Sequence, residues 1–361
     1  MNDIALLESP APMEGHGVYN RNSEVQATAV MPVLPLLERA AREAALPPAS
    51  EPIVIADYGS SEGRNSLPPM RLAIRELRRR DGQTRPISTV HTDQSGNDFS
   101  TLFKMLASDP DSYLRDDPNV FASAIGRSFY EQILPCESVT LGWSSWAVNW
   151  LSCRAAPIPD HVIGTLSGDA KVKAAFRRQA AADWRRFLTC RSRELRPGGR
   201  LVVTTLAQDE SGHSGYESLF DQLYGALLDL AEARLITQQE LRRMAVVTFA
   251  RSREEWCAPF AEGRQFAGLA LEEFQLFDAE DPLWADFARH RDAGALAARR
   301  AALFRAFAFP SLATGLDGGL ESPRAGEFVA RLEAAMAARL AAAPERGIRP
   351  TGRMLLVKVG A

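Results

Sequence analysis

The sequence predicts an α/β fold in which a doubly wound, mostly parallel sheet carries an additional helical region. Up to Leu206, short apolar runs rich in β-branched residues alternate with longer stretches of helix-forming residues. From about Gln208 the chain is rich in Ala, Leu, Phe and Arg, which is typical of helices. The 361 residues exceed one ordinary domain, so these two textures predict two units.

The first strand is expected at residues 51–57, where an apolar run ends at an acid and a glycine. A helix is expected to start near Ser66 or Pro68 and to reach Arg80, because proline is tolerated in a first helical turn and good helix formers follow. Further strands are expected at 86–92, 138–143 and 201–206, and a long helix at about 171–196. Such alternation implies right-handed crossovers and helices on both faces of the sheet.

The rest of the chain is expected to form a helical cap and one last strand. Helices are expected at 216–233 and 328–342, loops around 315–326, and a strand at 354–359 that returns to the sheet edge. The predicted units are therefore an N-terminal segment (1–50), an α/β core (51–207), a helical cap (208–350) and a final strand (351–361).

Composition excludes several classes of function. The net charge of -3 offers no cationic field, so neither nucleic acid nor a membrane surface is an expected partner. The N-terminus, with Asp3 and Glu8, lacks the basic and apolar regions of a secretion signal, and no apolar run approaches the roughly 18 residues of a membrane span. The four cysteines are scattered, which argues against zinc and favours a cytoplasmic protein with free thiols.

The glycine turn after the first strand is a candidate ligand site, because open α/β sheets bind ligands at the carboxyl ends of their strands. Its spacing, Gly59-x-x-x-Gly63, matches neither a dinucleotide fingerprint nor a phosphate-binding loop, so a ligand without a pyrophosphate fits better. Asp57 could hold an ammonium group, and Asp93 stands where nucleoside-binding folds grip ribose hydroxyls. The alternatives are a plain tight turn and, for Asp93, an N-cap of the next helix.

Half of the six tryptophans lie between Trp143 and Trp150. On a helix, Trp143, Trp146 and Trp150 would share one core-facing side. After a strand end they would instead give a ligand site an apolar wall and an indole N–H donor, which suits an acid. None of the five histidines belongs to a triad or a metal motif, and GxSxG is absent, so the sequence indicates no general base.

Six segments, taken in order, resemble the SABATH family of S-adenosylmethionine-dependent carboxyl methyltransferases, known mainly from plants and with bacterial relatives. Lysine is scarce among the basic residues, and we interpret the chain as a bacterial member. Three positions depart from the plant pattern: Glu14 replaces a lysine, Glu62 a serine, and Asn149 a histidine or methionine. The matching segments are Met13-Glu14-Gly15 through Tyr19 with Asn22-Ser23 and Gln26, then 55–65, 93–99, 128–130, 143–152, and 191–195 with 197–200.

The resemblance implies a class I methyltransferase fold that binds S-adenosyl-L-methionine (SAM) and releases S-adenosyl-L-homocysteine (SAH). It also implies that Asp57 lies near the methionine end, Asp93 at the ribose, and Ser128 and Phe129 at the adenine, while Gln26 and Trp150 orient the substrate carboxylate. The remaining implied residues are Ser23, Gly59 and Gln94 for the cofactor and Tyr19, Trp146, Asn149 and Phe220 or Tyr224 for the substrate pocket.

Carboxyl methylation agrees with the missing base, because an acid with a pKa near about 4 is already ionised at neutral pH. The expected substrate is a small aromatic or aliphatic acid, with a homodimer as the expected assembly. Magnesium is conceivable, although no motif supports it. The alternatives are N-methylation of a small heterocycle, an inactive cofactor-binding partner subunit and, on fold alone, a nicotinamide oxidoreductase.

Overall fold

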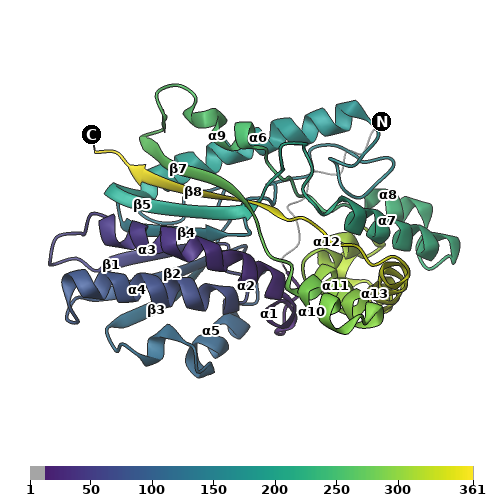
Figure 1. Ribbon diagram of the computed structural model, residues 1–361, viewed down its shortest axis with the longest axis horizontal. Coiled ribbons are helices and arrows are strands. Elements are labelled where there is room, and N and C mark those ends of the chain that lie inside the picture. Colours follow the sequence, from purple (N-terminus) through teal and green to yellow (C-terminus); the bar gives the residue numbers. More distant parts are fainter. Residues whose placement is uncertain (1–12, 361) are drawn as a thin grey trace.

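The structure, a computed structural model, describes residues 13–360 (Figure 1). Asp3 and Glu8 therefore lie outside the described residues. An eight-stranded sheet with the order β3-β2-β1-β4-β5-β8-β7-β6 forms the centre of the molecule. Its strands are β1 (Ile53–Tyr58), β2 (Ile87–Asp93), β3 (Val120–Gly126), β4 (Val139–Ser145), β5 (Leu195–Leu206), β6 (Gln265–Phe266), β7 (Leu269–Asp278) and β8 (Pro350–Lys358).

Helices cover both faces of the sheet, with α3 and α4 on one side and α6 and α9 on the other (Figure 1). The strands from β3 to β5 pair in parallel, whereas β8, β7 and β6 pair antiparallel to their neighbours. The doubly wound α/β prediction is confirmed. The helices are α1 (Val18–Asn22), α2 (Glu24–Val30), α3 (Leu34–Glu43), α4 (Leu67–Asp81), α5 (Phe99–Ser108), α6 (Ala170–Glu194), α7 (Glu217–Glu232), α8 (Gln238–Arg243), α9 (Arg253–Cys257), α10 (Pro282–His290), α11 (Ala293–Phe307), α12 (Phe309–Ala313) and α13 (Ala325–Ala342).

Strand β1 divides its side chains between two cores. Ile53 and Ile55 belong to the core shared with α3 and α4, and Ala56 and Tyr58 belong to the core under α6. Because side chains alternate along a strand, Asp57 faces the same layer as the two isoleucines. This alternation decides where its carboxylate can reach.

Three strands were not anticipated: β3, the two-residue β6 and β7. Strand β3 lies at the sheet edge with alternating exposure and small residues, and Phe121 is 56% exposed, so it lacks the continuous apolar run of a buried strand. Strand β7 lies within the stretch predicted to be entirely helical; its Leu, Glu and Gln residues favour helices, and a register shift between Leu271 and Glu273 interrupts its alternation. The wholly helical interpretation of 208–350 is therefore wrong at 265–278.

The last strand also differs from expectation. Strand β8 pairs with β5 on one side and with β7 on the other, so it lies inside the sheet and not at its edge. This position explains why Met354, Leu355 and Leu356 are completely buried.

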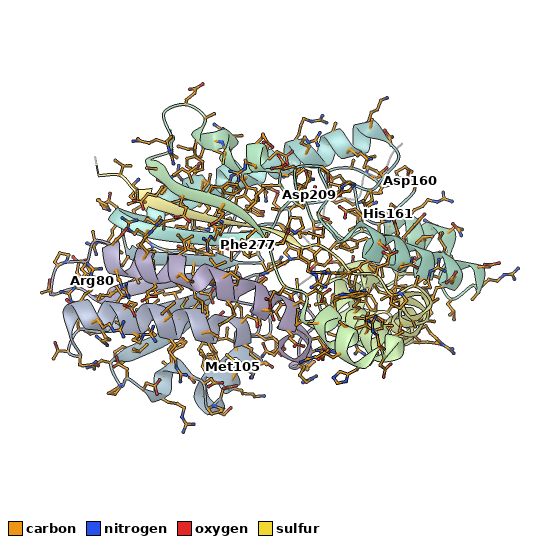
Figure 2. All side chains as sticks on the ribbon, viewed as in Figure 1. Arg80, Met105, Asp160, His161, Asp209 and Phe277 are labelled. Atoms are coloured by element: carbon orange, nitrogen blue, oxygen red, sulfur yellow. The ribbon has the colours of Figure 1, made fainter. Side chains whose placement is uncertain are left out.

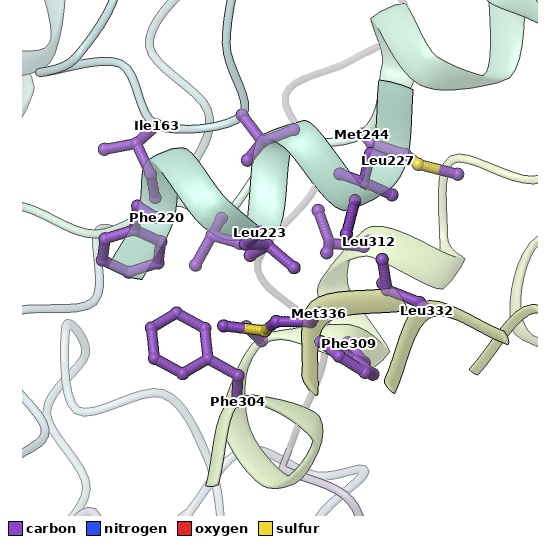
Figure 3. Close-up of a cluster of buried hydrophobic side chains, with 14 of the residues drawn as sticks. Ile163, Phe220, Leu223, Leu227, Met244, Phe304, Phe309, Leu312, Leu332 and Met336 are labelled. Carbon is purple, nitrogen blue, oxygen red and sulfur yellow. The ribbon is translucent and has the colours of Figure 1, made fainter. Parts of the chain in front are cut away.

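The cap packs around its own core, and the predicted helices at 216–233 and 328–342 correspond to α7 and α13. Figure 3 shows Phe220, Leu223 and Leu227 of α7 facing Phe304 and Met336. This core also includes Trp150, so the cap contacts the segment that follows β4.

Membrane-spanning and metal-binding features were searched over residues 13–360. In that part of the chain, no helix is both long and apolar enough to cross a membrane. Over the same residues, no group of three or more His, Cys, Asp or Glu side chains is arranged to hold a metal ion. All four cysteines are free thiols.

Candidate active site

A cavity of about 410 Å³ lies where the parallel strands end, and the helix α1 and the cap contribute to its walls. Residues from distant parts of the chain meet in it. The predicted site residues in its walls are Tyr19, Gly59, Asp93, Gln94, Ser128, Phe129, Trp146, Asn149, Trp150 and Phe220.

The glycine turn forms one wall of the cavity, and glycine is required at its first position. Gly59 has φ +91°, and a Cβ there would lie 2.3 Å from the Cβ of Ala147. The N–H groups of Gly59 and Ser60 both donate to the carbonyl of Thr92, at 2.9 and 3.0 Å, which ties the turn to the end of β2. The bare backbone allows a ligand to approach closely.

Asp93, the last residue of β2, lies next to the glycine turn. Its Oδ2 accepts from the backbone N–H of Ser61 at 2.8 Å, and its Oδ1 accepts from that of Gln94 at 2.8 Å. Burial raises the pKa of Asp93 to about 6, although these two hydrogen bonds act in the opposite direction. Asp98, not Asp93, caps the helix α5, so the N-cap alternative for Asp93 is excluded. Each oxygen keeps a lone pair for a further donor.

The loop that carries Ser128 and Phe129 is fixed by a buried ion pair at the end of α6. Arg191 and Glu194 are both completely buried, and their side chains pair at 2.7 and 2.9 Å. Arg191 also donates to the carbonyls of Phe129 at 2.7 Å and Glu131 at 2.8 Å. Glu194 accepts from the hydroxyl of Tyr58, the last residue of β1, at 2.7 Å. The pair therefore joins the two loops that flank the cavity.

The three clustered tryptophans do not lie on a helix. Trp143 is in β4 and is buried in the core beneath α3 and α4. Trp146 has a positive φ of 55°, and its N–H donates to the carbonyl of Thr204 at 2.9 Å. Trp146 and Trp150 both reach the cavity, so the prediction of an aromatic wall holds for two of the three.

Asn149 has an amide with a defined direction. Its side chain is 8% exposed, and its Oδ1 accepts from the hydroxyl of the buried Thr205 at 2.7 Å. The Nδ2 donates to none of the described residues. The wall at this position is thus polar and offers an N–H donor.

The apolar side of the cavity comes largely from residues that the sequence did not single out. Met13, Tyr216, Thr248 and Phe307 line it, and the rings of Trp150 and Phe307 meet edge to face at 6.4 Å. Met13 belongs to a segment of the family resemblance, but the other three lie in the region after Leu206, where the resemblance covers no motif.

The N-terminal segment closes over the cavity and is held at three points. Glu62, which is 1% exposed, accepts from the backbone N–H of Gly17 at 2.6 Å and of Asn20 at 3.0 Å. The N–H of His16 donates to Asp98 at 2.9 Å. Glu14 forms a bidentate ion pair with Arg305 of α11, at 2.8 and 2.9 Å. Two of the three departures from the plant pattern, Glu14 and Glu62, therefore make these contacts.

Some predicted site residues lie outside the cavity walls. The carboxylate of Asp57 contacts Nδ1 of His91 at 2.9 Å. Ser23 and Gln26 are buried beside α1, and Oε1 of Gln26 has no hydrogen-bond partner among the described residues. The ring of Tyr224 packs at a tilt against that of His161, which Figure 2 labels, with the ring centroids 4.8 Å apart. Of Phe220 and Tyr224, only Phe220 therefore lines the cavity. The roles of these four residues stay predictions.

Comparison with known proteins identifies the family. A family model described as SAM dependent carboxyl methyltransferase matches residues 11–336, which is most of the chain. The chain belongs to the SAM-dependent carboxyl methyltransferase family. This result confirms the family resemblance of the motifs.

Individual members of the family agree with this assignment. The chain is 30% identical over 243 residues to the methyltransferase FUS9 of Gibberella moniliformis, which covers 67% of this chain and 64% of that protein. It therefore spans less than two thirds of the length of that fungal relative. It is 28% identical over 240 residues to a benzoic acid/salicylic acid carboxyl methyltransferase of Petunia hybrida, with 63% of this chain and 67% of that protein covered. The bacterial origin stays a prediction.

A solved structure of a loganic acid methyltransferase with SAH has the same fold. Its TM-score is 0.78 at 19% identity, with 97% of this chain and 99% of that chain covered. The class I methyltransferase fold with a helical cap is thus confirmed.

The cavity fits the cofactor of the SAM-dependent carboxyl methyltransferase family. Asp93 retains acceptor sites for two ribose hydroxyls, the Gly59 turn leaves room for the backbone to approach, and Phe129 offers a ring face for adenine. Ser128 and Gln94 line the same cavity.

Proposed function

We propose that this protein transfers the methyl group of SAM to the carboxylate of a small acid, giving a methyl ester and SAH. One observation carries the proposal: the carboxylate of Asp93, the glycine turn at Gly59 and the indole of Trp150 share one cavity. The described walls of this cavity contain no His, Lys or Cys. Such a cavity can hold a cofactor and an acid side by side, and its described walls offer no imidazole, amine or thiol as a general base.

The reaction needs none. When bound, SAM supplies a methyl group on a positively charged sulfur, and an ionised carboxylate is already a nucleophile at neutral pH. The methyl group leaves sulfur with its bonding pair remaining there, and the carboxylate oxygen forms the new bond, so two opposite charges become neutral products. Apolar walls such as Phe220 and Phe307 exclude water and favour this loss of charge.

The contribution of the chain is alignment. The indole N–H of Trp150 and the amide N–H of Asn149 can each donate to a carboxylate oxygen, and Thr205 fixes the direction of the Asn149 amide. Burial raises the pKa of Tyr19 far above neutrality, so its hydroxyl stays a donor as well. By resemblance Gln26 completes the carboxylate-orienting set. Because Gln26 does not line the described cavity walls, we propose that Trp150 contributes more than Gln26 to orienting the carboxylate.

The product distinguishes the candidate reactions. Purified protein, deuterated SAM and a panel of aromatic and aliphatic acids should give products with a transferred methyl group that mild base releases as methanol. A base-stable N-methyl product from a heterocycle would replace ester formation with the N-methyltransferase alternative. Tight SAH binding with no transfer to any acid would favour the inactive partner subunit.

Two further predictions accompany this proposal. We propose a homodimer, which size-exclusion chromatography with light scattering tests directly. We also propose a cytoplasmic location, consistent with four free thiols and tested by cell fractionation. Magnesium is not needed in this scheme, so EDTA should leave the rate unchanged.

A further inference from the structure

A second cavity of about 410 Å³ adjoins the active-site cavity, and we call it the far cavity. Leu206, Phe220 and Thr248 belong to the walls of both cavities. Each of the three is less than one tenth exposed, so together they form a buried partition. A ligand that spans both cavities would pass between these side chains.

The far cavity has both apolar and polar walls. Ile163, Leu166 and Phe249 supply apolar surface, while the exposed Lys173 and Arg177 of α6 lie at its mouth with Glu217 of α7. Gln208, His213 and Ser214 also line it. Figure 3 shows Ile163 beside Phe220 and the ring of Phe304 on the other side of Phe220. The far cavity thus continues the apolar wall of the active site beyond Phe220.

Among the described residues at the mouth, Lys173 is a cation without an ion pair, and Glu217 keeps its negative charge, because only neutral donors hold its carboxylate. Arg177 pairs with Glu255 at 2.9 Å, and the carboxylate of Glu217 accepts from the N–H and the hydroxyl of Ser214 at 2.6 and 2.8 Å. Lys173 forms no ion pair with any described residue. An ammonium group that forms no ion pair beside a cavity can recognise an anionic group on a ligand.

The active-site cavity must hold the cofactor together with the acid, which leaves little of its 410 Å³ for a large substrate. We propose that the acceptor is an elongated acid. Its reacting carboxylate lies at Trp150, its apolar body passes Phe220 and Thr248, and its far end carries an anionic group that Lys173 binds. This inference rests on the proposed function and names its substrate class.

Matched acids test the proposal. Monocarboxylic acids and α,ω-dicarboxylic acids of equal chain length, from six to sixteen carbons, are compared as methyl acceptors with benzoate as the short reference. We expect the ratio of kcat/KM for diacid to monoacid to reach at least tenfold at one chain length. Lys173→Met should then lower this ratio about tenfold, whereas the control Lys171→Met, an exposed lysine of the same helix outside the cavity walls, should leave it unchanged.

A second variant keeps the test independent of charge. Leu166→Trp places an indole ring in the far cavity in place of a smaller side chain and should raise KM for long acids more than for benzoate. The melting temperature checks that the variant is folded. Benzoate as the best acceptor, with ratios that neither variant changes, would overturn the elongated substrate and leave carboxyl methylation intact. No ester from any acid would overturn both.

Discussion

The carboxylate of Glu62 accepts a hydrogen bond from the backbone N–H of Gly17 at 2.6 Å. Glu62 lies in the glycine turn, and Gly17 immediately precedes the helix that carries Tyr19. The glycine turn and the N-terminal segment that lines the cavity through Tyr19 are therefore one hydrogen-bonded unit.

Removal of this contact should affect substrate use more than the fold. In Glu62→Ala the N–H groups of Gly17 and Asn20 lose a charged acceptor, which costs about 1.5–3 kcal/mol for a hydrogen bond to a charged group. We expect a kcat/KM for the acid at least tenfold lower, because Tyr19 loses its fixed position. Steady-state kinetics check this against Glu210→Ala, an exposed glutamate, and equal kinetics for both variants would contradict it.

The indole N–H of Trp150 should serve the acid and not the cofactor. Trp150→Phe keeps an aromatic wall but removes the donor, so we expect KM for the acid to rise and kcat/KM to fall 10- to 100-fold, which is about 1.4–2.7 kcal/mol. Calorimetry with SAH should give an unchanged affinity. An equal loss of acid use and of SAH affinity would contradict the role of Trp150.

Asp93 should make cofactor binding depend on pH. Ribose hydroxyls donate to the ionised carboxylate, and the pKa of Asp93 in the free protein is about 6, raised by burial. As pH falls below about 6, Asp93 takes up a proton, and SAH affinity should fall by up to about tenfold per pH unit. The free protein, in contrast, gains stability over the same range, because its folded state binds this proton more tightly than the unfolded chain does.

Titration of SAH by calorimetry between pH 5 and pH 8 measures this effect. Asp93→Asn should bind SAH more weakly at pH 8 and show a flat profile below it. A wild-type affinity that is constant down to pH 5 would show that the cofactor does not meet this carboxylate.

The buried pair of Arg191 and Glu194 should be necessary for the fold around the adenine end. Arg191→Met leaves Glu194 buried without its cation, which typically costs about 3–5 kcal/mol. Urea unfolding should show this loss, with Arg193→Met, an exposed arginine of the same helix, as the matched control. A difference below about 1 kcal/mol between the two variants would contradict the role of the pair.

The sequence predicted the half of the fold whose strands have strong local signals. Buried parallel strands such as β1 and β4 have nearly continuous apolar runs, and the glycine after β1 and the acid that ends β2 mark the ligand edge. Strand β7 has no such signal, because it pairs antiparallel in the sheet while its composition favours a helix. Tertiary pairing, not local propensity, determines its conformation.

The site residues also divide into those that a local sequence signal marks and those that depend on tertiary packing. Gly59 directly follows β1, Asp93 ends β2, and Trp150 lies in the segment after β4, so these residues could be predicted from their position near strand ends. Tyr216, Thr248 and Phe307 come from cap segments whose positions depend on how α7 and α11 pack, so no local pattern marks them. The resemblance implies that Asp57 lies near the methionine end of the cofactor; its carboxylate contacts His91, and its cofactor role stays a prediction.

The most direct test of the central claim is the pH dependence of kcat for an accepted acid, with SAM and acid both saturating. The account predicts a flat profile from pH 7 to pH 9 and a solvent deuterium isotope effect near one, because the carboxylate is ionised throughout and no proton moves during transfer. A log kcat that rises with pH toward a plateau, together with an isotope effect of about two or more, would reveal a general base and contradict the account.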